Sequence, residues 1–296
     1  MRLRIIIVLA LARLMVAADV SPIEITHPPK YKRLADYTRE AIAQTLKNVP
    51  EVWQSQEDTI RFRIVARADD FRAAVGADLP DWVGAVTLFP QDLVVVRSPD
   101  LSRSTLREYR STVVHELIHL LQGQYVPLNL TPVWFNEGVA VYYTGEFGLR
   151  NRIVVSKALF RKKLIPLEKI ERVLKFSHLQ ADLAYAESAA LIEFIEMVYG
   201  VGTVVEILKT MRSGVEFERA VMQATDTGYE NLLNQWEKYL ACKYQWIFLL
   251  DIQNILWLIM PVAALLAYLS IRRRNKVTLK QWNDEETYEN SDESNI

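Results

Sequence analysis

Two histidines four residues apart, set among apolar residues, constrain this chain more than any other feature. If the segment around them is helical, His115 and His119 project from one face of the helix, one turn apart. Glu116 lies beside them at the edge of that face. Two neutral imidazoles and a nearby carboxylate supply two zinc ligands and a base for the water that the metal activates. The pattern predicts a buried helix with a catalytic zinc site; the alternative is two surface histidines on an ordinary helix.

Composition and charge limit the classes of protein to consider. The chain has 296 residues, of which 50% are hydrophobic and 24% charged, enough for a sizeable core in one or two domains. Its net charge of −1 provides no basic surface for a phosphate backbone, so we expect no nucleic-acid partner. The single cysteine, Cys242, allows no internal disulfide and lies far in sequence from the paired histidines. The two remaining histidines, His27 and His178, are expected in loops.

The two ends of the chain have the patterns of membrane targeting and anchoring. Residues 1–18 combine Arg2 and Arg4 with an apolar run and a small-residue end, which is typical of a signal peptide. Residues 255–271 carry no charge, and basic residues follow at once. We therefore predict a transmembrane helix over 246–271 whose basic flank stays in the cytoplasm.

Together the ends predict a single-pass protein of the cell membrane with its main domain outside the cytoplasm. That domain is expected over residues 19–245, as an α/β part (19–100) and a helical part (101–245) that holds the zinc site. Residues 272–296 are predicted to form a cytoplasmic acidic tail. Because the chain after Lys280 has acidic residues and no basic one, we expect that stretch to be disordered. The sequence indicates no oligomeric state.

Hydrophobic periodicity predicts an α+β fold. We expect a helix over 31–48, a half-buried strand over 60–65, and two strands over 83–88 and 93–96 joined by a turn at 90–92. The first half is thus predicted to be a small mixed sheet with helices, and the second half a mainly α-helical subdomain. Its helical segments are expected at 153–164, 166–174, 181–199, 202–212, 215–224 and 229–245.

Two neighbouring helices are predicted to form the site. Ser102 or Ser104 is expected to cap the first helix, and Gly123 to end it. The second helix covers 133–143 and carries Glu137, a lone carboxylate among apolar residues. Burying an unpaired carboxylate is costly, and a dication removes that cost. Glu137 is therefore the candidate third ligand; the alternative is a surface or capping role.

These two segments resemble the gluzincin metallopeptidases, in which two histidines on one helix and a glutamate on the next bind zinc. Residues 115–119 and 134–140 are similar to the two motifs, although Glu137 follows the second histidine slightly sooner than in the well-known branches. The chain is most similar to the small bacterial peptidase-MA-like domains. Residues 184–190 resemble a further helix of those domains. Over residues 82–240 the resemblance implies a zincin-like helical subdomain and a zinc-dependent peptidase.

The resemblance also implies a role for individual side chains. His115, His119 and Glu137 would bind Zn²⁺. Glu116 would be the general base that takes a proton from water and passes it to the leaving amine. Tyr185 is the candidate donor to the oxyanion of the transition state, and its alternative role is packing.

A departure from the neutral aminopeptidases favours an endopeptidase. In the strand where those enzymes carry a glutamate for the substrate's free amine, this chain has Thr87, which has no charge to pair with an ammonium. We therefore expect a membrane-anchored zinc endopeptidase acting on peptide or protein substrates. The alternative is a non-catalytic membrane receptor or scaffold with a vestigial zinc domain. An intramembrane protease is excluded, because the histidines lie more than a hundred residues from the apolar segment.

Overall fold

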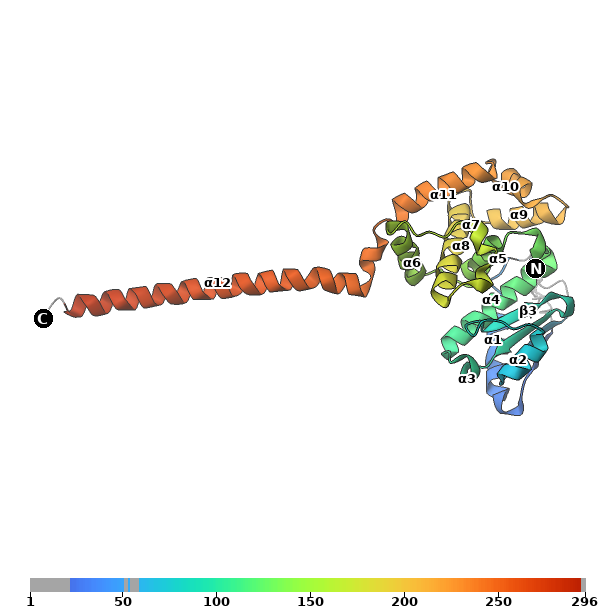
Figure 1. The fold of residues 1–296 in the computed structure, drawn as a ribbon, viewed down its shortest axis with the longest axis horizontal. Coiled ribbons are helices and arrows are strands. Elements are labelled where there is room, and N and C mark those ends of the chain that lie inside the picture. Colours follow the sequence, from blue (N-terminus) through green and yellow to red (C-terminus); the bar gives the residue numbers. More distant parts are fainter. Residues whose placement is uncertain (1–21, 51–52, 54–58, 294–296) are drawn as a thin grey trace, which may run out of the picture. The chain divides into compact units, whose positions relative to one another are not determined.

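The computed structural model describes residues 22–50, 53 and 59–293. They form the predicted α+β fold, mainly helical, with a four-stranded mixed sheet in the first part of the chain (Figure 1). The predicted signal peptide, residues 1–18, lies outside the described residues.

The chain divides into two compact units. The first comprises Met1–Gly148 and Ile165–Asn234, and the second comprises Leu149–Leu164 and Gln235–Ile296. All residues predicted to form the zinc site therefore belong to the first unit.

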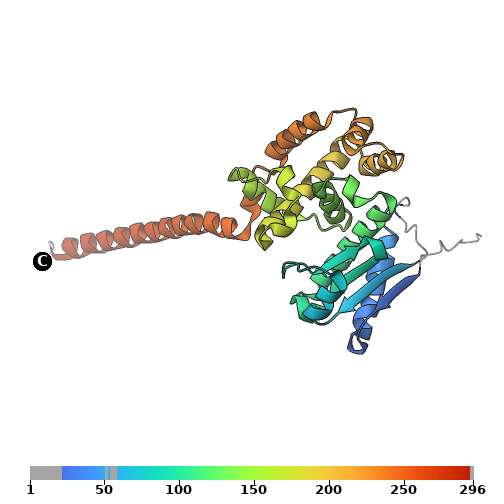
Figure 2. The same ribbon diagram turned by 45° about the vertical axis from the view of Figure 1, so that its right-hand side comes forward.

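The sheet of the first unit has the strand order β1-β2-β4-β3, and its strands lie side by side in Figure 2. Strands β1, β2 and β4 are parallel, and β3 pairs with β4 antiparallel at the edge. The three predicted strands are confirmed, and β1 joins them although it is too short to show a clear alternation. The bounds are β1 (Ile23–Thr26), β2 (Ile60–Val65), β3 (Ala85–Leu88) and β4 (Leu93–Arg97).

Helices pack on both faces of the sheet, although Arg61 and Arg63 of β2 are exposed on the face that α2 partly covers. Val65 and Val95 pack with Phe71 of α2 on one face. Phe62 and Val94, paired in register, point to the opposite face, where α1 and α4 lie. The helical elements up to this point are η1 (Pro29–Tyr31), α1 (Lys32–Leu46), α2 (Ala68–Val75), η3 (Phe89–Gln91), α3 (Pro99–Ser102) and α4 (Leu106–Tyr125).

Helix α4 carries the two histidines and is buried on most of its surface. It begins with a capping box: the Thr105 hydroxyl accepts from the Glu108 N–H, and the Glu108 carboxylate accepts from the Thr105 N–H. The prediction that Ser102 or Ser104 caps this helix was wrong. Ser102 ends α3, and its hydroxyl bonds that of Ser104 at 2.8 Å.

Gly123 was predicted to end this helix, but α4 continues to Tyr125. The glycine is required by packing instead. A Cβ built on Gly123 would lie 2.0 Å from a ring carbon of Phe89, in the turn between β3 and β4. The missing side chain thus lets the turn of the sheet approach the helix that carries the histidines.

Helix α5 has the predicted bounds and packs against α8. Gly138 makes this approach possible, since an added Cβ would lie 2.5 Å from the Ser188 carbonyl oxygen and 2.8 Å from Ile192. The predicted helical character of this part of the chain is confirmed. Its elements are η4 (Leu128–Leu130), α5 (Val133–Tyr143), α7 (Leu167–Ile170), η5 (Val173–Lys175), α8 (His178–Val198), α9 (Thr203–Arg212) and α10 (Phe217–Thr225).

The second unit is helical and leads into the apolar segment. The Ser156 hydroxyl donates to the Tyr244 carbonyl and accepts from the Phe248 N–H at 2.8 Å, which joins α6 to the chain that follows α11. The elements are α6 (Leu149–Phe160), α11 (Tyr229–Tyr244, which begins in the first unit), η6 (Ile247–Leu250) and α12 (Ile252–Glu293).

The predicted membrane segment 246–271 is not one helix from its start. Asp251 has an extended backbone between η6 and α12, and its carboxylate pairs with Lys157. Within the described residues, α12 is the one helix that is long and apolar enough to cross a membrane, over Ile255–Asn283, and its apolar side chains are exposed. This supports a single membrane-spanning helix by length and composition.

The tail after Lys280 was predicted to be disordered, and this was wrong up to Glu293. Helix α12 continues without a break to that residue. Residues 272–293 contain no glycine or proline and several arginine, lysine, glutamine and glutamate residues, which have high helix propensity. Nothing in this composition ends a helix that the apolar segment has already begun.

Candidate metal centre

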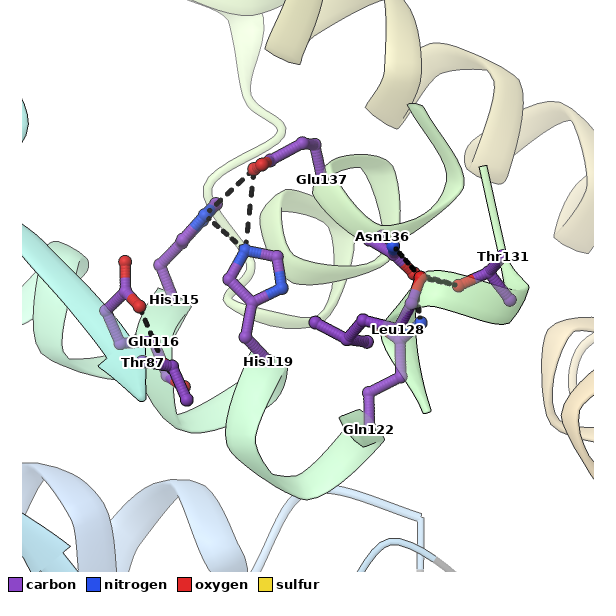
Figure 3. Close-up of polar contacts among 9 residues, drawn as sticks. All are labelled: Thr87, His115, Glu116, His119, Gln122, Leu128, Thr131, Asn136 and Glu137. Carbon is purple, nitrogen blue, oxygen red and sulfur yellow. Dashed lines mark hydrogen bonds and ion pairs between the residues drawn. The ribbon is translucent and has the colours of Figure 1, made fainter. Parts of the chain in front are cut away.

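Three side chains from α4 and α5 point toward one another (Figure 3). The Nε2 atoms of His115 and His119 lie 3.0 Å apart. An oxygen of Glu137, Oε2, lies 3.2 Å from the first of these nitrogens and 3.4 Å from the second. Among the described residues this is the one group of three His, Cys, Asp or Glu side chains arranged to hold a metal ion, with ligand atoms within 4.8 Å of one another.

The environment of this cluster favours a bound cation. All three side chains are largely buried, and the two imidazole nitrogens face Glu137 Oε2 without the geometry of a regular hydrogen bond. Burial by itself disfavours the charged forms, but attraction between Glu137 and the imidazoles outweighs it. This attraction raises the pKa of His115 to about 9 and lowers the pKa of Glu137 to about 2. A bound cation would displace the proton of His115, and two neutral imidazoles and a charged carboxylate in a largely buried site are a donor set that fits Zn²⁺.

A hydrogen-bond network fixes the start of α5 against the end of α4 (Figure 3). Gln122 Nε2 donates to Asn136 Oδ1 at 2.7 Å, and the Thr131 hydroxyl donates to the same oxygen. Asn136 Nδ2 donates to the Leu128 carbonyl at 3.0 Å. Because Asn136 directly precedes Glu137, the network sets where that carboxylate enters the site. These polar partners were not predicted, since they are spread over two helices and a loop.

Glu116 is held by the edge strand of the sheet. The Thr87 hydroxyl lies 2.7 Å from Glu116 Oε2, to which it donates, and 3.2 Å from the Glu116 carbonyl oxygen. Thr87 pairs in register with Val94, so strand alternation places it on the face covered by α4. In the sequence, Thr87 was noted only because it stands where the neutral aminopeptidases carry a glutamate.

Tyr185 of α8 also reaches this site. Its ring centroid lies 6.1 Å from that of His115. Burial, together with the negative charges of Glu137 and Glu116, raises the pKa of Tyr185 above its ordinary value. The phenol therefore keeps its proton and remains a hydrogen-bond donor, as the predicted role requires.

A further carboxylate, Glu146, lies in the loop after α5 and was not predicted. Burial raises its pKa, while the positive charges of His115, Arg107 and Arg110 act in the opposite direction. Glu146 is therefore within electrostatic reach of His115 and of two arginines in the first turns of α4. No sequence pattern pointed to it, because a lone glutamate in a loop is ordinary.

The two remaining histidines are not part of the cluster. His178 was predicted to lie in a loop, but it is the first residue of α8, where Ser177 and Gln180 form a capping box that starts the helix early. Its exposed ring lies 3.4 Å from Asp182. His27 lies in a loop as predicted, with Nδ1 2.9 Å from the carbonyl oxygen of the next residue.

One of three comparisons with known proteins found a match. No curated protein and no solved structure matches the chain. A family model described as the peptidase MA superfamily matches residues 44–242, more than half of the chain. The matched range includes α4, α5 and α8, which carry every residue predicted to form the site. The chain therefore belongs to the peptidase MA superfamily.

Proposed function

We propose that this protein is a zinc-dependent peptidase, with His115, His119 and Glu137 as its metal ligands. The observation that carries the proposal is the convergence of their three donor atoms in a buried site within a peptidase-superfamily domain. When bound there, Zn²⁺ would supply a Lewis acid that polarises the scissile carbonyl and makes water more acidic.

Glu116 is the general base of this proposal. It accepts a proton from the attacking water and delivers it to the nitrogen of the leaving amine. The hydrogen bond from Thr87 to Oε2 restricts rotation of the carboxylate and leaves Oε1 as the acceptor for that proton. A base held in one orientation reacts without first having to be ordered.

Tyr185 is proposed to donate its phenol proton in a hydrogen bond to the oxygen that becomes negative in the transition state. Two features support this role: the ring lies beside His115, and its pKa is raised, so the donor stays protonated. Donors fixed in a water-poor site stabilise such an oxyanion more strongly than water does.

We further propose that the enzyme is an endopeptidase anchored in the cell membrane by α12, with its catalytic domain outside the cytoplasm. The uncharged segment 255–271 and the basic residues after it support this topology through the positive-inside rule. Thr87, in place of a carboxylate for a substrate amine, supports internal cleavage of peptides.

The test uses the full chain, purified in detergent. We expect one zinc ion per chain by elemental analysis and hydrolysis of end-blocked peptides from a mixed library. Glu116→Gln should keep the zinc and lose hydrolysis by a factor of about 10³ or more, as expected for an essential general base. His119→Ala should lose the zinc.

Undiminished hydrolysis by Glu116→Gln would refute the proposed mechanism, and a chain that binds no zinc would refute the metal centre. Zinc without hydrolysis of any peptide would favour a receptor or scaffold. An unfolding midpoint of Glu116→Gln close to that of the wild type, and of His119→Ala close to that of the zinc-depleted wild type, would show that these losses are not caused by misfolding.

A further inference from the structure

In the second unit, the end of α6 lies against the chain that leads into the apolar helix α12 (Figure 1). The rings of Phe160 and Phe248 lie 4.7 Å apart, and Lys157 pairs with Asp251, the residue directly before α12. The uncharged segment 255–271 begins only four residues after Asp251. A bilayer that holds this segment would therefore have its surface close to the end of α6.

A turn of three basic residues, Arg161, Lys162 and Lys163, follows α6. All three are exposed, and among the described residues no carboxylate forms an ion pair with them. The backbone of this basic turn is a Schellman motif: the Lys162 N–H donates to the Leu159 carbonyl at 3.0 Å, and the Lys163 N–H to the Ala158 carbonyl at 2.8 Å. Lys162 has a φ of 55°, where glycine is the usual residue. The motif thus fixes the backbone beneath three adjacent positive charges.

The second unit is strongly basic before the uncharged segment, although the net charge of the whole chain is −1. Residues 149–164 and 235–254 contain eight lysine or arginine residues and two acidic ones, a net charge of +6. One of the two carboxylates, that of Asp251, already pairs with Lys157. The other acidic residues of this unit lie between 284 and 293, beyond the uncharged segment and so on the opposite side of a bilayer that it spans.

Apolar side chains of the same unit are exposed as well. Phe160, the last residue of α6, is 61% exposed, and Trp246 and Leu250, at the two ends of the apolar run 246–250, are 63% and 54% exposed. At a bilayer surface such side chains bury their apolar parts, while lysine and arginine reach the phosphates. An acidic protein would match the charges alone, whereas exposed rings beside a membrane segment favour lipid.

We propose that the end of α6, the basic turn and the run 246–250 form a surface that docks on the anionic headgroups of the bilayer that holds α12. Each basic residue close to an anionic bilayer strengthens binding about fivefold. The basic turn lies more than 90 residues before the uncharged segment, outside the range that the positive-inside rule counts, so it does not oppose the proposed topology. This surface rests on the proposed anchoring by α12 and extends it to a folded part of the chain.

The reactivity of lysines tests the surface in the unaltered full chain. The protein is placed in lipid nanodiscs of phosphatidylcholine alone or with added phosphatidylglycerol, and acetylation of each lysine is followed by mass spectrometry. We expect Lys162 and Lys163 to react at least about fivefold more slowly in the anionic discs. High salt should remove this difference, since it screens exposed charges. Lys47, exposed just after α1 in the first unit, is the control and should react equally in both discs.

A second measurement removes the charges. A polarity-sensitive dye is attached to Phe160→Cys in a Cys242→Ser background, and its quenching by brominated phosphatidylglycerol in the discs is recorded. Arg161→Gln, Lys162→Gln and Lys163→Gln together should lose most of the quenching, whereas arginine at both lysine positions should retain it.

The matched control is a triple variant in α1 and the residue after it, Lys32→Gln, Arg33→Gln and Lys47→Gln, which removes the same charge from exposed positions. It should quench like the parent. Equal quenching of the two triple variants would refute a role for the basic turn.

The outcomes separate this surface from the proposed anchoring, and none of them depends on peptide hydrolysis. If the chain stays in the discs but Lys162 and Lys163 react equally in both lipids, only the surface fails. Slow reaction already in detergent would also overturn it, because another part of the chain or a second copy would then cover the turn. If the chain does not insert, yet phosphatidylglycerol vesicles bind it in a manner that requires the basic turn, the anchoring fails and the surface stands.

Discussion

Thr87 on the edge strand donates a hydrogen bond of 2.7 Å to the carboxylate of Glu116 on the helix that carries the histidines. Strand β3 is therefore part of the site as well as of the fold. A base whose carboxylate can rotate must be ordered in each turnover, whereas this one is oriented before substrate arrives. Thr87 carries no charge that could bind a substrate amine, but it has another role, because it holds the proposed base Glu116.

Replacing Thr87 tests that function directly. Thr87→Val keeps the shape and removes the donor, and we expect kcat to fall about tenfold, since hydrogen bonds to charged groups contribute about 1.5–3 kcal/mol. Zinc content should not change, because Thr87 touches none of the three ligands. Thr87→Ser retains the hydroxyl and should retain most of the rate. Equal rates for the Val and Ser variants would show that the hydrogen bond does not orient the base.

The Asn136 network should control how firmly Glu137 is placed. Asn136→Ala removes bonds to Gln122, Thr131 and Leu128, leaving buried partners unsatisfied. We expect zinc affinity to fall by about tenfold, because the start of α5 and with it Glu137 would no longer be fixed, although Asn136 bonds none of the ligands directly. The measurement is a competition titration with a zinc chelator. Asn231→Ala, at an exposed position of α11, is the matched control and should leave the affinity unchanged.

Gly138→Ala should loosen α5 from α8. The new methyl group would lie 2.5 Å from the Ser188 carbonyl oxygen, a contact that only backbone movement relieves. We expect a loss of about 1–3 kcal/mol in the free energy of unfolding, as for other overpacked cores, read from the shift of the thermal midpoint. Gly228→Ala places its Cβ in open space and should change stability by less than about 0.5 kcal/mol.

Glu187 should make the stability of the protein depend on pH. The side chain is fully buried on α8, and both of its oxygens face the Ile165 N–H, at 3.2 and 3.0 Å. Burial raises the pKa of Glu187 to about 8, although the bond from Ile165 acts in the opposite direction. The folded state therefore binds this proton more tightly than the unfolded state, whose pKa is near 4.5.

The direction of the pH dependence of stability follows from that difference between the folded and unfolded pKa values of Glu187. The stabilising contribution is complete below about pH 4.5 and is lost as the pH rises through about 8, at up to about 1.4 kcal/mol per pH unit. Glu187→Gln removes the titration and keeps an acceptor for Ile165. We expect the thermal midpoint of the wild type to fall more than that of the variant between pH 5 and pH 8.5. Parallel curves for the two proteins would contradict the shifted pKa.

Helix α12 should hold the protein in a bilayer. Leu265 lies near the middle of the uncharged segment 255–271 and is exposed. Leu265→Arg should reduce the fraction of chain that resists carbonate extraction from membranes, because a central arginine costs about 2.5–3.5 kcal/mol of insertion free energy. Leu279→Arg, beyond the basic flank, is the control and should extract like the wild type. If Leu265→Arg also extracts like the wild type, residues 255–271 do not span the membrane.

Local patterns in the sequence were sufficient to predict the parts of the site that lie within single helices. The spacing of His115 and His119 placed both imidazoles on one face, and the apolar run around Glu137 predicted α5 with the bounds that the structure has. Some predictions failed on local signals, since Thr105 rather than Ser102 or Ser104 caps α4. Another failed because of a longer-range contact. Gly123 does not end α4, which continues to Tyr125. Its missing side chain makes room for the ring of Phe89.

The sequence by itself determined that the chain has a two-histidine helix, a following helix with a buried carboxylate, and an apolar segment near its end. Helical and strand periodicities are local properties, and the sequence displays them directly. Only the tertiary structure decided that Thr87 of β3 bonds Glu116 and that Arg110 of α4 meets Gln44 of α1. Those pairs lie 29 and 66 residues apart, and the packing of the sheet and α1 against α4 brings them together.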